Sequence, residues 1–512
     1  MKIKKYILPI GGIALGACGV VPEKTHPNVL YVFPDQFRNC AMSFWNDAEY
    51  SSAHGWVADP SVTPNLNAFA GESVVLSNAM SSCPLSSPYR GMFLTGMYPE
   101  RSGIMSNCMA ERPNNTLRKD AECISDVFST NGYSCGYIGK FHAEVPMKND
   151  PANPGHYVSE RRPEWDAYTP KERRHGFDYW YSYGTFDEHK NPHYWDTEGK
   201  KHTPKEFSVK HEVDKAIEYL RNENGEREKN KPFFLCVAFN PPHSPYSGPE
   251  DCISEDYSLY ADKKLKDLYV RDNADTTLAK APSIRYYLSN VTTVDREFGR
   301  LLSELKKQGL DKNTIVVFTA DHGETMCSHS TPDPKNSIWT ESFNVPFMVR
   351  YPKVLSHKIE PLMLTPVDIM PTLLSLSGLE NKIPKTVEGK DYSAVLKGKS
   401  EKRPEAVLYI RNINGKKDSD SLVRNFFPVA RGIKTNEYTM EIVIDRKYRL
   451  KSINIFNDIS DPYQMHRIIP EDNLELFDSL CVLLQKKLKE SNDIWYREGI
   501  MQKLSHSFPR RR

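Results

Sequence analysis

The stretch NVLYVF, from Asn28 to Phe33, decides the fold class of this chain, and the residues around it carry the chemistry. It is a short apolar run rich in β-branched and aromatic residues, which predicts a buried strand. A carboxylate, Asp35, follows the run almost at once. Similar runs recur along the chain at 134–140, 232–240, 314–321 and 345–352 (SCGYIGK, PFFLCVAFN, TIVVFTAD and VPFMVRYP).

Amphipathic helical patterns separate these runs. Between residues 292 and 310, Val294, Phe298, Leu301 and Leu305 fall at helical spacing, and Gly309 supplies a stop signal. Alternating strands and helices predict an α/β fold with a large mixed, mostly parallel sheet sandwiched by helices. Ligands of such sheets collect at the carboxyl ends of the strands.

The sequence pattern of the chain changes near residue 400. Strand-like pieces then follow at short spacing (406–410, 438–444 and 448–456), and an amphipathic helix follows at 473–490. We therefore expect a catalytic domain at 18–400 and a smaller α+β C-terminal domain with an antiparallel sheet at 401–512. An aromatic segment without clear periodicity, 144–205, is either a surface loop or a wall of a binding cleft, and its aromatic density favours the cleft.

The N-terminus predicts export. Three lysines within residues 2–5 precede a short apolar stretch that ends in LGAC at Cys18, which resembles a bacterial lipobox. Residues 1–17 would then be a lipoprotein signal peptide, and Cys18 the lipid anchor of a protein in the periplasm or at the cell surface. A buried helix with a chance cysteine is the alternative, but the glycines and the proline of this stretch disfavour a helix.

Charge and cysteine content narrow the function classes. The 512 residues carry a net charge of +2, so no basic excess points to nucleic acid or to an acidic membrane surface. Beyond Cys18 there are nine cysteines, an odd number, and no C-x-x-C motif. Buried free thiols are the expectation, although an oxidising envelope permits disulfides.

Acidic residues stand directly after two of the predicted strands. Asp35 follows the first, and Asp321 and His322 follow TIVVFTA. A lone aspartate there is usually a turn or helix cap. Two of them at the carboxyl ends of parallel strands would instead meet and bind a hard divalent cation.

Cationic residues follow other strands. Lys140 and His142 follow a strand in GYIGKFH and share one side of an extended chain, while His243 lies in AFNPPHSPY and Lys335 in DPKNSIWTES. Each alone would be a structural histidine or a solvated lysine. Gathered beside a metal, they would suit an oxyanion such as sulfate or phosphate.

With these strand-end residues the chain resembles a known family, the type I sulfatases of the alkaline-phosphatase-like superfamily. The family signature is a cysteine or serine followed four residues later by arginine and closed by Leu-Thr-Gly. In SSPYRGMFLTG the arginine is Arg90, so the key position is Ser86 and not Cys83. Further blocks match in order, among them GYIGKFH, FNPPHSPY, VVFTADHGE, KNSIWTESFNVPFMVRYP and TPVDIMPTLLSLSGL.

The resemblance implies a covalent mechanism. The family's cysteine or serine is oxidised after translation to formylglycine, whose hydrate attacks the sulfur atom and displaces the alcohol. The second hydroxyl of the hydrate then expels sulfate and restores the aldehyde. A serine at this position implies a serine-capable, oxygen-independent maturation enzyme as a partner.

The resemblance also implies roles for individual residues. Asp35, Gln36, Asp321, His322 and the modified Ser86 would hold one divalent ion. Arg90 would hold the formylglycine hydroxyl and a carboxylate, and Lys140, His243 and Lys335 would bind sulfate oxygens. His142 would be the base that drives sulfate release, with His243 or Lys335 as the acid near the leaving oxygen. His329 either touches the substrate or is a solvated loop histidine.

Two ligand positions depart from the common pattern. Gln36 stands where many members have a second aspartate, and His322 where many have asparagine. Calcium is the family's ion, but a nitrogen ligand suits manganese or zinc better.

The expected substrate is a sulfated carbohydrate, such as mucin O-glycan, glycosaminoglycan or algal polysaccharide. The sequence fixes neither the sugar nor the sulfate position. Two alternatives stay open: a phosphodiesterase or phosphonate monoester hydrolase of the same superfamily, and a non-catalytic, lipid-anchored glycan-binding protein whose aromatic loops stack on sugars.

Overall fold

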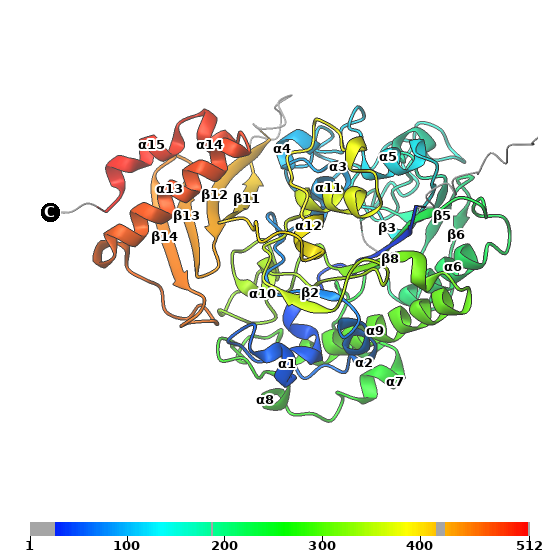
Figure 1. The fold of residues 1–512 in the computed structure, drawn as a ribbon, viewed down its shortest axis with the longest axis horizontal. Helices are drawn as coiled ribbons and strands as arrows, with labels where there is room; N and C mark the ends of the chain where they lie inside the picture. The colour runs from blue at the N-terminus through cyan, green and yellow to red at the C-terminus, as the bar shows by residue number, and fades with distance from the viewer. Residues whose placement is uncertain (1–25, 186–187, 416–424, 510–512) are drawn as a thin grey trace, which may run out of the picture.

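A computed structural model describes residues 26–185, 188–415 and 425–509. Within these ranges the chain forms a ten-stranded sheet and a separate four-stranded sheet, which lie side by side (Figure 1). The predicted signal peptide and Cys18 lie outside the described residues. No helix in the described part of the chain has the length and apolar character needed to cross a membrane.

The large sheet is mixed and mostly parallel, as the sequence predicts. From edge to edge its strands are β10 (Lys358–Glu360), β2 (Val74–Leu76), β9 (Phe347–Arg350), β8 (Thr314–Thr319), β1 (Asn28–Val32), β7 (Phe233–Ala238), β3 (Ser134–Lys140), β4 (Tyr179–Tyr183), β5 (Tyr194–Asp196) and β6 (Lys201–His202). The run from β8 to β4 is parallel throughout, and β9 is antiparallel to both of its neighbours. Every residue of β1, β3, β7 and β8 is buried, which explains their continuous apolar sequences.

Helices cover both faces of this sheet (Figure 1). Those that precede the second sheet are α1 (Ala48–Ser51), α2 (Pro64–Ala70), α3 (Ser86–Thr95), α4 (Pro99–Ser102), α5 (Ile124–Thr130), α6 (Ser208–Arg221), α7 (Ser254–Ser258), α8 (Leu265–Leu268), α9 (Ile284–Lys307), α10 (Thr340–Phe343), α11 (Pro366–Leu376) and α12 (Ser393–Leu396). Helix α9 packs against α2, α6 and α7 in one layer, and α3 packs against α5 and α11 in the other. Helix α9 starts earlier than the sequence pattern indicates and ends just before Gly309, whose φ is +67°.

The second sheet lies at the C-terminal end. It consists of β11 (Val407–Asn414), β12 (Phe426–Lys434), β13 (Tyr438–Ile444) and β14 (Leu450–Asn457), all antiparallel. Helices α13 (Leu474–Glu490), α14 (Ile494–Arg497) and α15 (Ile500–Leu504) follow it. Its core also includes Cys83, Met92 and Val367 from the larger part of the chain. The second sheet is therefore joined to helices α3 and α11 of the larger part by a shared apolar cluster.

The interpretation of the aromatic segment as a cleft wall is wrong for its central rings. Tyr179–Tyr183 forms β4 and Tyr194–Asp196 forms β5, so the segment extends the large sheet. Trp180, Tyr183 and Tyr194 are at most 1% exposed. Because these rings are buried, they offer no exposed face for a sugar. Packing of aromatic rings against the sheet and against each other is favourable.

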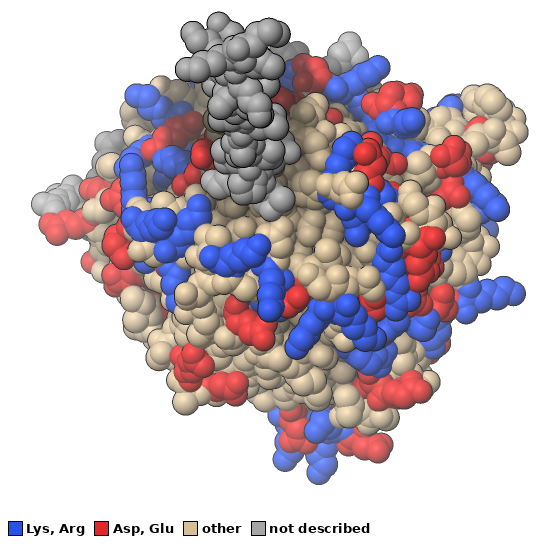
Figure 2. All heavy atoms as spheres, turned by 45° about the vertical axis from the view of Figure 1, so that its right-hand side comes forward, with Lys and Arg blue, Asp and Glu red and all other residues tan. Residues whose placement is uncertain are grey.

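The cysteine prediction is confirmed for the described residues. All nine cysteines after Cys18 are buried and free. The visible face of the molecule carries interspersed basic and acidic side chains (Figure 2), in keeping with the small net charge.

Candidate active site

The candidate site lies where four neighbouring strands end. β8, β1, β7 and β3 are adjacent and parallel, so their carboxyl ends meet at one edge of the sheet. Asp321 follows β8, Asp35 follows β1, His243 follows β7, and Lys140 is the last residue of β3. The structure thus brings together the acids and cations that the sequence places after separate strands.

Ser86 and Arg90 reach this edge from helix α3. Ser86 is the first residue of α3, and Arg90 lies four residues later, so both side chains share one helix face. The Ser86 Oγ atom is 3.1 Å from His322 Nε2 and 3.4 Å from Asp35 Oδ1. Cys83, by contrast, packs in the apolar cluster under the second sheet, where burial raises its pKa to about 12.

Arg90 links the two carboxylates. One guanidinium nitrogen, Nη2, is 3.2 Å from both Asp35 Oδ2 and Asp321 Oδ2. The other, Nη1, donates to the Tyr137 hydroxyl and to the Lys140 carbonyl oxygen. Arg90 is 1% exposed, so its fork fixes the relative position of α3 and three strand ends in a medium of low polarity.

Asp35, Asp321 and His322 form a group that fits a divalent cation. One ligand atom of each lies within 4.8 Å of the others, and all three side chains are fully buried. Burial and the neighbouring Asp35 raise the pKa of Asp321 well above its usual range, and burial together with Lys335 lowers the pKa of His322 to about 3. Burial alone would raise the pKa of Asp35, but Lys140 and the nearby histidines hold it well below its usual range.

Gln36 offers a fourth ligand. Its backbone has a φ of +64°, and its N–H donates to Asp321 Oδ1 at 3.0 Å. Its side-chain Nε2 donates to Glu324, while Oε1 is buried and has no hydrogen-bond partner among the described residues. A buried amide oxygen without a donor beside two carboxylates is suited to a cation.

The cations surround the acids on the other sides. Lys140 Nζ lies 2.8 Å from Asp35 Oδ2, and burial lowers the pKa of this amine below its usual range. Lys335 Nζ is 3.0 Å from His243 Nε2 and 3.4 Å from His322 Nε2. His243 and Lys335 are only half-buried, so they form the rim through which an anion would enter.

His142 lies at the same edge of the sheet. The sequence places it there by the two-residue period of an extended strand, but the strand does not reach it. Strand β3 ends at Lys140, and the backbone turns into the left-handed region at His142, with a φ of +44°. Its ring is buried, and both ring nitrogens lack a hydrogen-bond partner among the described residues. Burial, with the charges of Lys140 and Arg90, lowers its pKa well below the usual value, which favours the neutral imidazole.

The His329 side chain is held among neighbouring side chains and is not solvated. Its ring stacks on Trp339 with centroids 3.7 Å apart, and its Nε2 lies 3.4 Å from Glu341 Oε2. Its backbone N–H donates to the Asn273 carbonyl oxygen at 2.8 Å. The interpretation of His329 as a solvated loop histidine is therefore wrong, because this network holds the ring inside the structure. The contact of His329 with substrate stays a prediction.

Three residues of the site have no role in the sequence-based prediction. Glu324 and Tyr246 contact Gln36, and Asn240 Oδ1 accepts from Lys140 Nζ at 3.4 Å. All three stand inside the matching blocks VVFTADHGE and FNPPHSPY. Their contacts join residues far apart in the chain, which no local period reveals.

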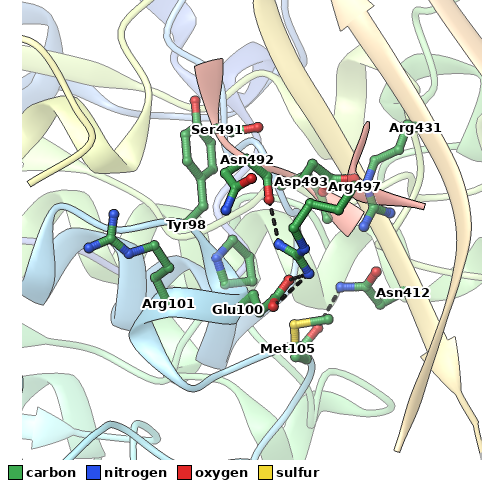
Figure 3. Close-up of a pocket in the computed structure, with 12 residues that line it drawn as sticks. Tyr98, Glu100, Arg101, Met105, Asn412, Arg431, Ser491, Asn492, Asp493 and Arg497 are labelled. Carbon is green, nitrogen blue, oxygen red and sulfur yellow. Dashed lines mark hydrogen bonds and ion pairs between the residues drawn. The ribbon is translucent and has the colours of Figure 1, made fainter. Parts of the chain in front are cut away.

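A cavity between helix α4 and the C-terminal sheet with its helices is a poor alternative site. It has a volume of about 90 Å³ and is lined by Tyr98, Arg101, Asn412 and Asn492, among others (Figure 3). Pockets that bind drug-sized ligands are about 300–1,000 Å³. This cavity is too small for a saccharide ring.

Comparison with known proteins agrees with this site. A sequence model of the Sulfatase family matches residues 27–379, and one of the C-terminal part of N-sulphoglucosamine sulphohydrolase matches 331–493. An endo-4-O-sulfatase of Bacteroides thetaiotaomicron is 53% identical over 94% of this chain and 96% of its own length. An ulvan-active sulfatase of Formosa agariphila is 30% identical over 95% of this chain and 86% of its own length.

A solved structure shows the same architecture. It comes from a study of the metabolism of multiple glycosaminoglycans by Bacteroides thetaiotaomicron, and it superposes with a TM-score of 0.91 at 53% identity. The match covers 93% of this chain and 99% of that chain. The chain therefore belongs to the type I sulfatase family of the alkaline-phosphatase-like superfamily, and it is a sulfuric ester hydrolase.

Proposed function

We propose that this sulfatase removes sulfate esters from position 4 of sugar residues within a sulfated polysaccharide. The relative that is 53% identical over nearly the full length is an endo-4-O-sulfatase, and the ulvan-active relative also acts on a polysaccharide. The observation that carries the proposal is the position of Ser86 Oγ, which contacts buried Asp35 and His322 beside Lys140 and Lys335. A sulfate ester needs such cations to neutralise its oxygens.

Ser86 is the proposed source of the nucleophile. A serine-capable maturation enzyme would oxidise its CH₂OH group to the aldehyde of formylglycine, which then adds water. Arg90, one helical turn away, would hold the resulting hydroxyl while it bridges Asp35 and Asp321. The hydrate can release sulfate and return to the aldehyde, whereas a plain serine ester has no such exit.

Asp35, Gln36, Asp321 and His322 would hold the metal ion together with modified Ser86. A bound divalent ion neutralises negative charge and lowers the pKa of a hydroxyl beside it. Two carboxylates and an amide oxygen suit calcium, while the nitrogen of His322 suits manganese or zinc. Calcium is the ion that we propose.

The remaining residues would handle the sulfate group and its protons. Lys140 and Lys335 would bind sulfate oxygens from two sides of the pocket. His142, a neutral buried imidazole, would accept the proton that must leave before sulfate is expelled. Lys335 and His243, which contact each other at the rim, would supply a proton to the leaving sugar oxygen.

Export is part of the proposal. The lipobox-like sequence at Cys18 supports lipid attachment and a periplasmic or cell-surface location, where large glycans or their fragments are available. A Cys18→Ala variant is expected to leave the membrane fraction, while its retention there would contradict the anchor.

One experiment tests the activity. Protein produced with the maturation enzyme is incubated with oligosaccharides sulfated only at O4 or only at O6, and sulfate release is measured. We expect release from the O4 esters, a Ser86 peptide lighter by two hydrogens, and loss of activity on the order of 10³-fold or more in Ser86→Ala. Turnover by protein with an unmodified serine would contradict the mechanism, and preference for phosphate esters would favour the hydrolase alternative.

A further inference from the structure

We propose that Glu324 is a positioning residue that commits the Gln36 side chain to presenting its oxygen, and not its nitrogen, to the metal ion. A glutamine amide has an oxygen on one side and an NH₂ group on the other, and the two ends have nearly the same shape. Only the oxygen can bind a cation. A glutamine in a metal site therefore needs a neighbouring residue that hydrogen-bonds to the NH₂ group and so leaves the amide oxygen facing the ion.

Glu324 is such a neighbour. Its Oε2 accepts from Gln36 Nε2 and from the Tyr246 hydroxyl, the latter at 3.0 Å, and its Oε1 accepts from the Met326 N–H at 2.9 Å. Among the described residues, three donors hydrogen-bond to this carboxyl, which is the pattern of an ionised carboxylate. If the Gln36 amide were reversed, its oxygen would face the carboxylate oxygen and repel it.

The backbone of Gln36 is fixed as well. Tyr287 donates to the Gln36 carbonyl oxygen at 2.8 Å and accepts from the Arg38 N–H at 3.0 Å. These bonds hold the left-handed conformation of Gln36 from outside the site. With the backbone fixed and Nε2 bound to Glu324, the buried Oε1 is the atom left for the ion.

The hydrogen bond between Gln36 and Glu324 also explains why position 36 is a glutamine. Many family members have a second aspartate at this position, which would add a negative charge. An aspartate at position 36 would have no side-chain N–H to donate, so its carboxylate would be turned toward that of Glu324 without a hydrogen bond between them. In the pair of Gln36 and Glu324, the negative charge is on the Glu324 carboxylate, which hydrogen-bonds to the proposed ligand. The ligand itself, the Gln36 amide, is neutral. Hydrogen-bonded partners of this kind typically change metal affinity 10- to 100-fold when they are removed.

The inference rests on the metal site of the proposed function, so the test measures bound metal directly. Holoenzyme is dialysed against EGTA-buffered Ca²⁺, with a parallel series in buffered Mn²⁺, and bound metal per chain is counted by elemental analysis. The variants are Glu324→Gln, Tyr246→Phe, Gln36→Asp and the double variant Gln36→Asp/Glu324→Gln. Glu441→Gln is the matched control, because Glu441 is also a buried glutamate that accepts from an amide, at Asn454, but it lies in the C-terminal sheet.

We expect Glu324→Gln to raise the free metal concentration for half-occupancy about 10- to 100-fold. Tyr246→Phe should have a smaller effect, and Glu441→Gln none. In the Gln36→Asp background, Glu324→Gln should cause no loss and should improve binding, because it removes a carboxylate that faces another. Thermal melts of the metal-free variants show whether a change reflects altered folding.

Two results would overturn the role of Glu324. One is that Glu324→Gln retains metal as the wild type does. The other is that Glu324→Gln weakens metal binding equally in the wild-type and Gln36→Asp backgrounds, since Glu324 would then not act through the Gln36 amide. A Gln36→Ala variant separates this from failure of the site itself. If Gln36→Ala also retains metal as wild type does, the assignment of Gln36 as a ligand is wrong.

Discussion

At the scale of single residues, the site depends on how buried charges compensate one another. Asp35 and Asp321 lie side by side without solvent, and Arg90 and Lys140 supply the positive charge that keeps them there. Removing one partner of such a buried pair is costly, because the other is left without compensation. The residues that we propose for the chemistry therefore also stabilise the fold.

Arg90→Lys tests this dependence. A lysine ammonium cannot contact Asp35, Asp321, Tyr137 and the Lys140 carbonyl as the planar guanidinium does. We expect the metal-free variant to lose about 3–5 kcal/mol of unfolding free energy, measured by urea denaturation in the presence of a chelator. A variant as stable as the wild type would show that the carboxylates do not need this bridge.

At the scale of elements, helix α3 must end so that its first turn stays at the sheet edge. Gly96 follows its last residue with a φ of +66°, and a Cβ there would lie 2.9 Å from Val387 Cγ1. The Gly96 carbonyl oxygen also accepts from the Glu388 N–H at 2.8 Å. The helix that carries Ser86 is thus fixed at its far end by backbone geometry.

Gly96→Ala should lower the unfolding free energy by about 2–5 kcal/mol, the sum of left-handed strain and overpacking. Gly398→Ala is the matched control, because Gly398 has a φ of +67° but no atom within 4 Å of its would-be Cβ. That variant should lose only about 1–2 kcal/mol. Equal losses in thermal or urea melts would mean that the contact with Val387 is unimportant.

A second prediction at this scale concerns the helix layer. Arg221 of α6 donates to both carboxylate oxygens of Glu304 of α9, at 2.7 and 2.8 Å. These hydrogen bonds lower the pKa of Glu304 to about 2. Because the pKa is lower in the folded chain, the stabilisation is complete above the unfolded value of about 4.3 and fades as pH falls toward 2.

Arg221→Gln should therefore lower the melting temperature at pH 7, and the difference from wild type should shrink as pH falls from 5 to 3. Melts recorded across this range provide the measurement. A difference that stays constant with pH would show that the pair contributes by packing and not through the ionised carboxylate.

At the scale of the whole molecule, the C-terminal sheet contacts the segments that carry the candidate active site. The Ile410 N–H of β11 donates to the Ser82 carbonyl oxygen at 2.8 Å, four residues before Ser86. The Tyr409 hydroxyl contacts the Asn336 carbonyl oxygen, next to Lys335, at 3.4 Å. Arg497 of α14 pairs with Glu100 of α4 through two contacts of 2.8 Å, so this helix also reaches the catalytic part (Figure 3).

We expect the described parts of the chain to unfold in one calorimetric transition, because Cys83, Met92 and Val367 belong to the core of the second sheet. A chain truncated at residue 400 should expose this cluster and aggregate. Arg497→Ala is the control and should cost no more than about 1 kcal/mol, since this pair is partly exposed. Two well-separated transitions would contradict a shared core.

Sequence alone determined the class of the fold and the residue types of the site. Buried parallel strands have to be apolar along their whole length, so β1, β3, β7 and β8 are visible as continuous runs, and the acids that follow them are visible too. The roles assigned to these residues remain predictions. The strand β4 was missed, because an aromatic run reads equally well as a cleft wall and as a buried strand.

Tertiary structure decided what local patterns do not contain. The antiparallel placement of β9, the burial of the aromatic segment and the stacking of His329 on Trp339 all depend on which neighbours a residue meets. The orientation of the Gln36 amide depends on Glu324, 288 residues along the chain. Contacts at such separations follow from the packing of the whole sheet, since no periodicity in the sequence specifies which strand ends meet.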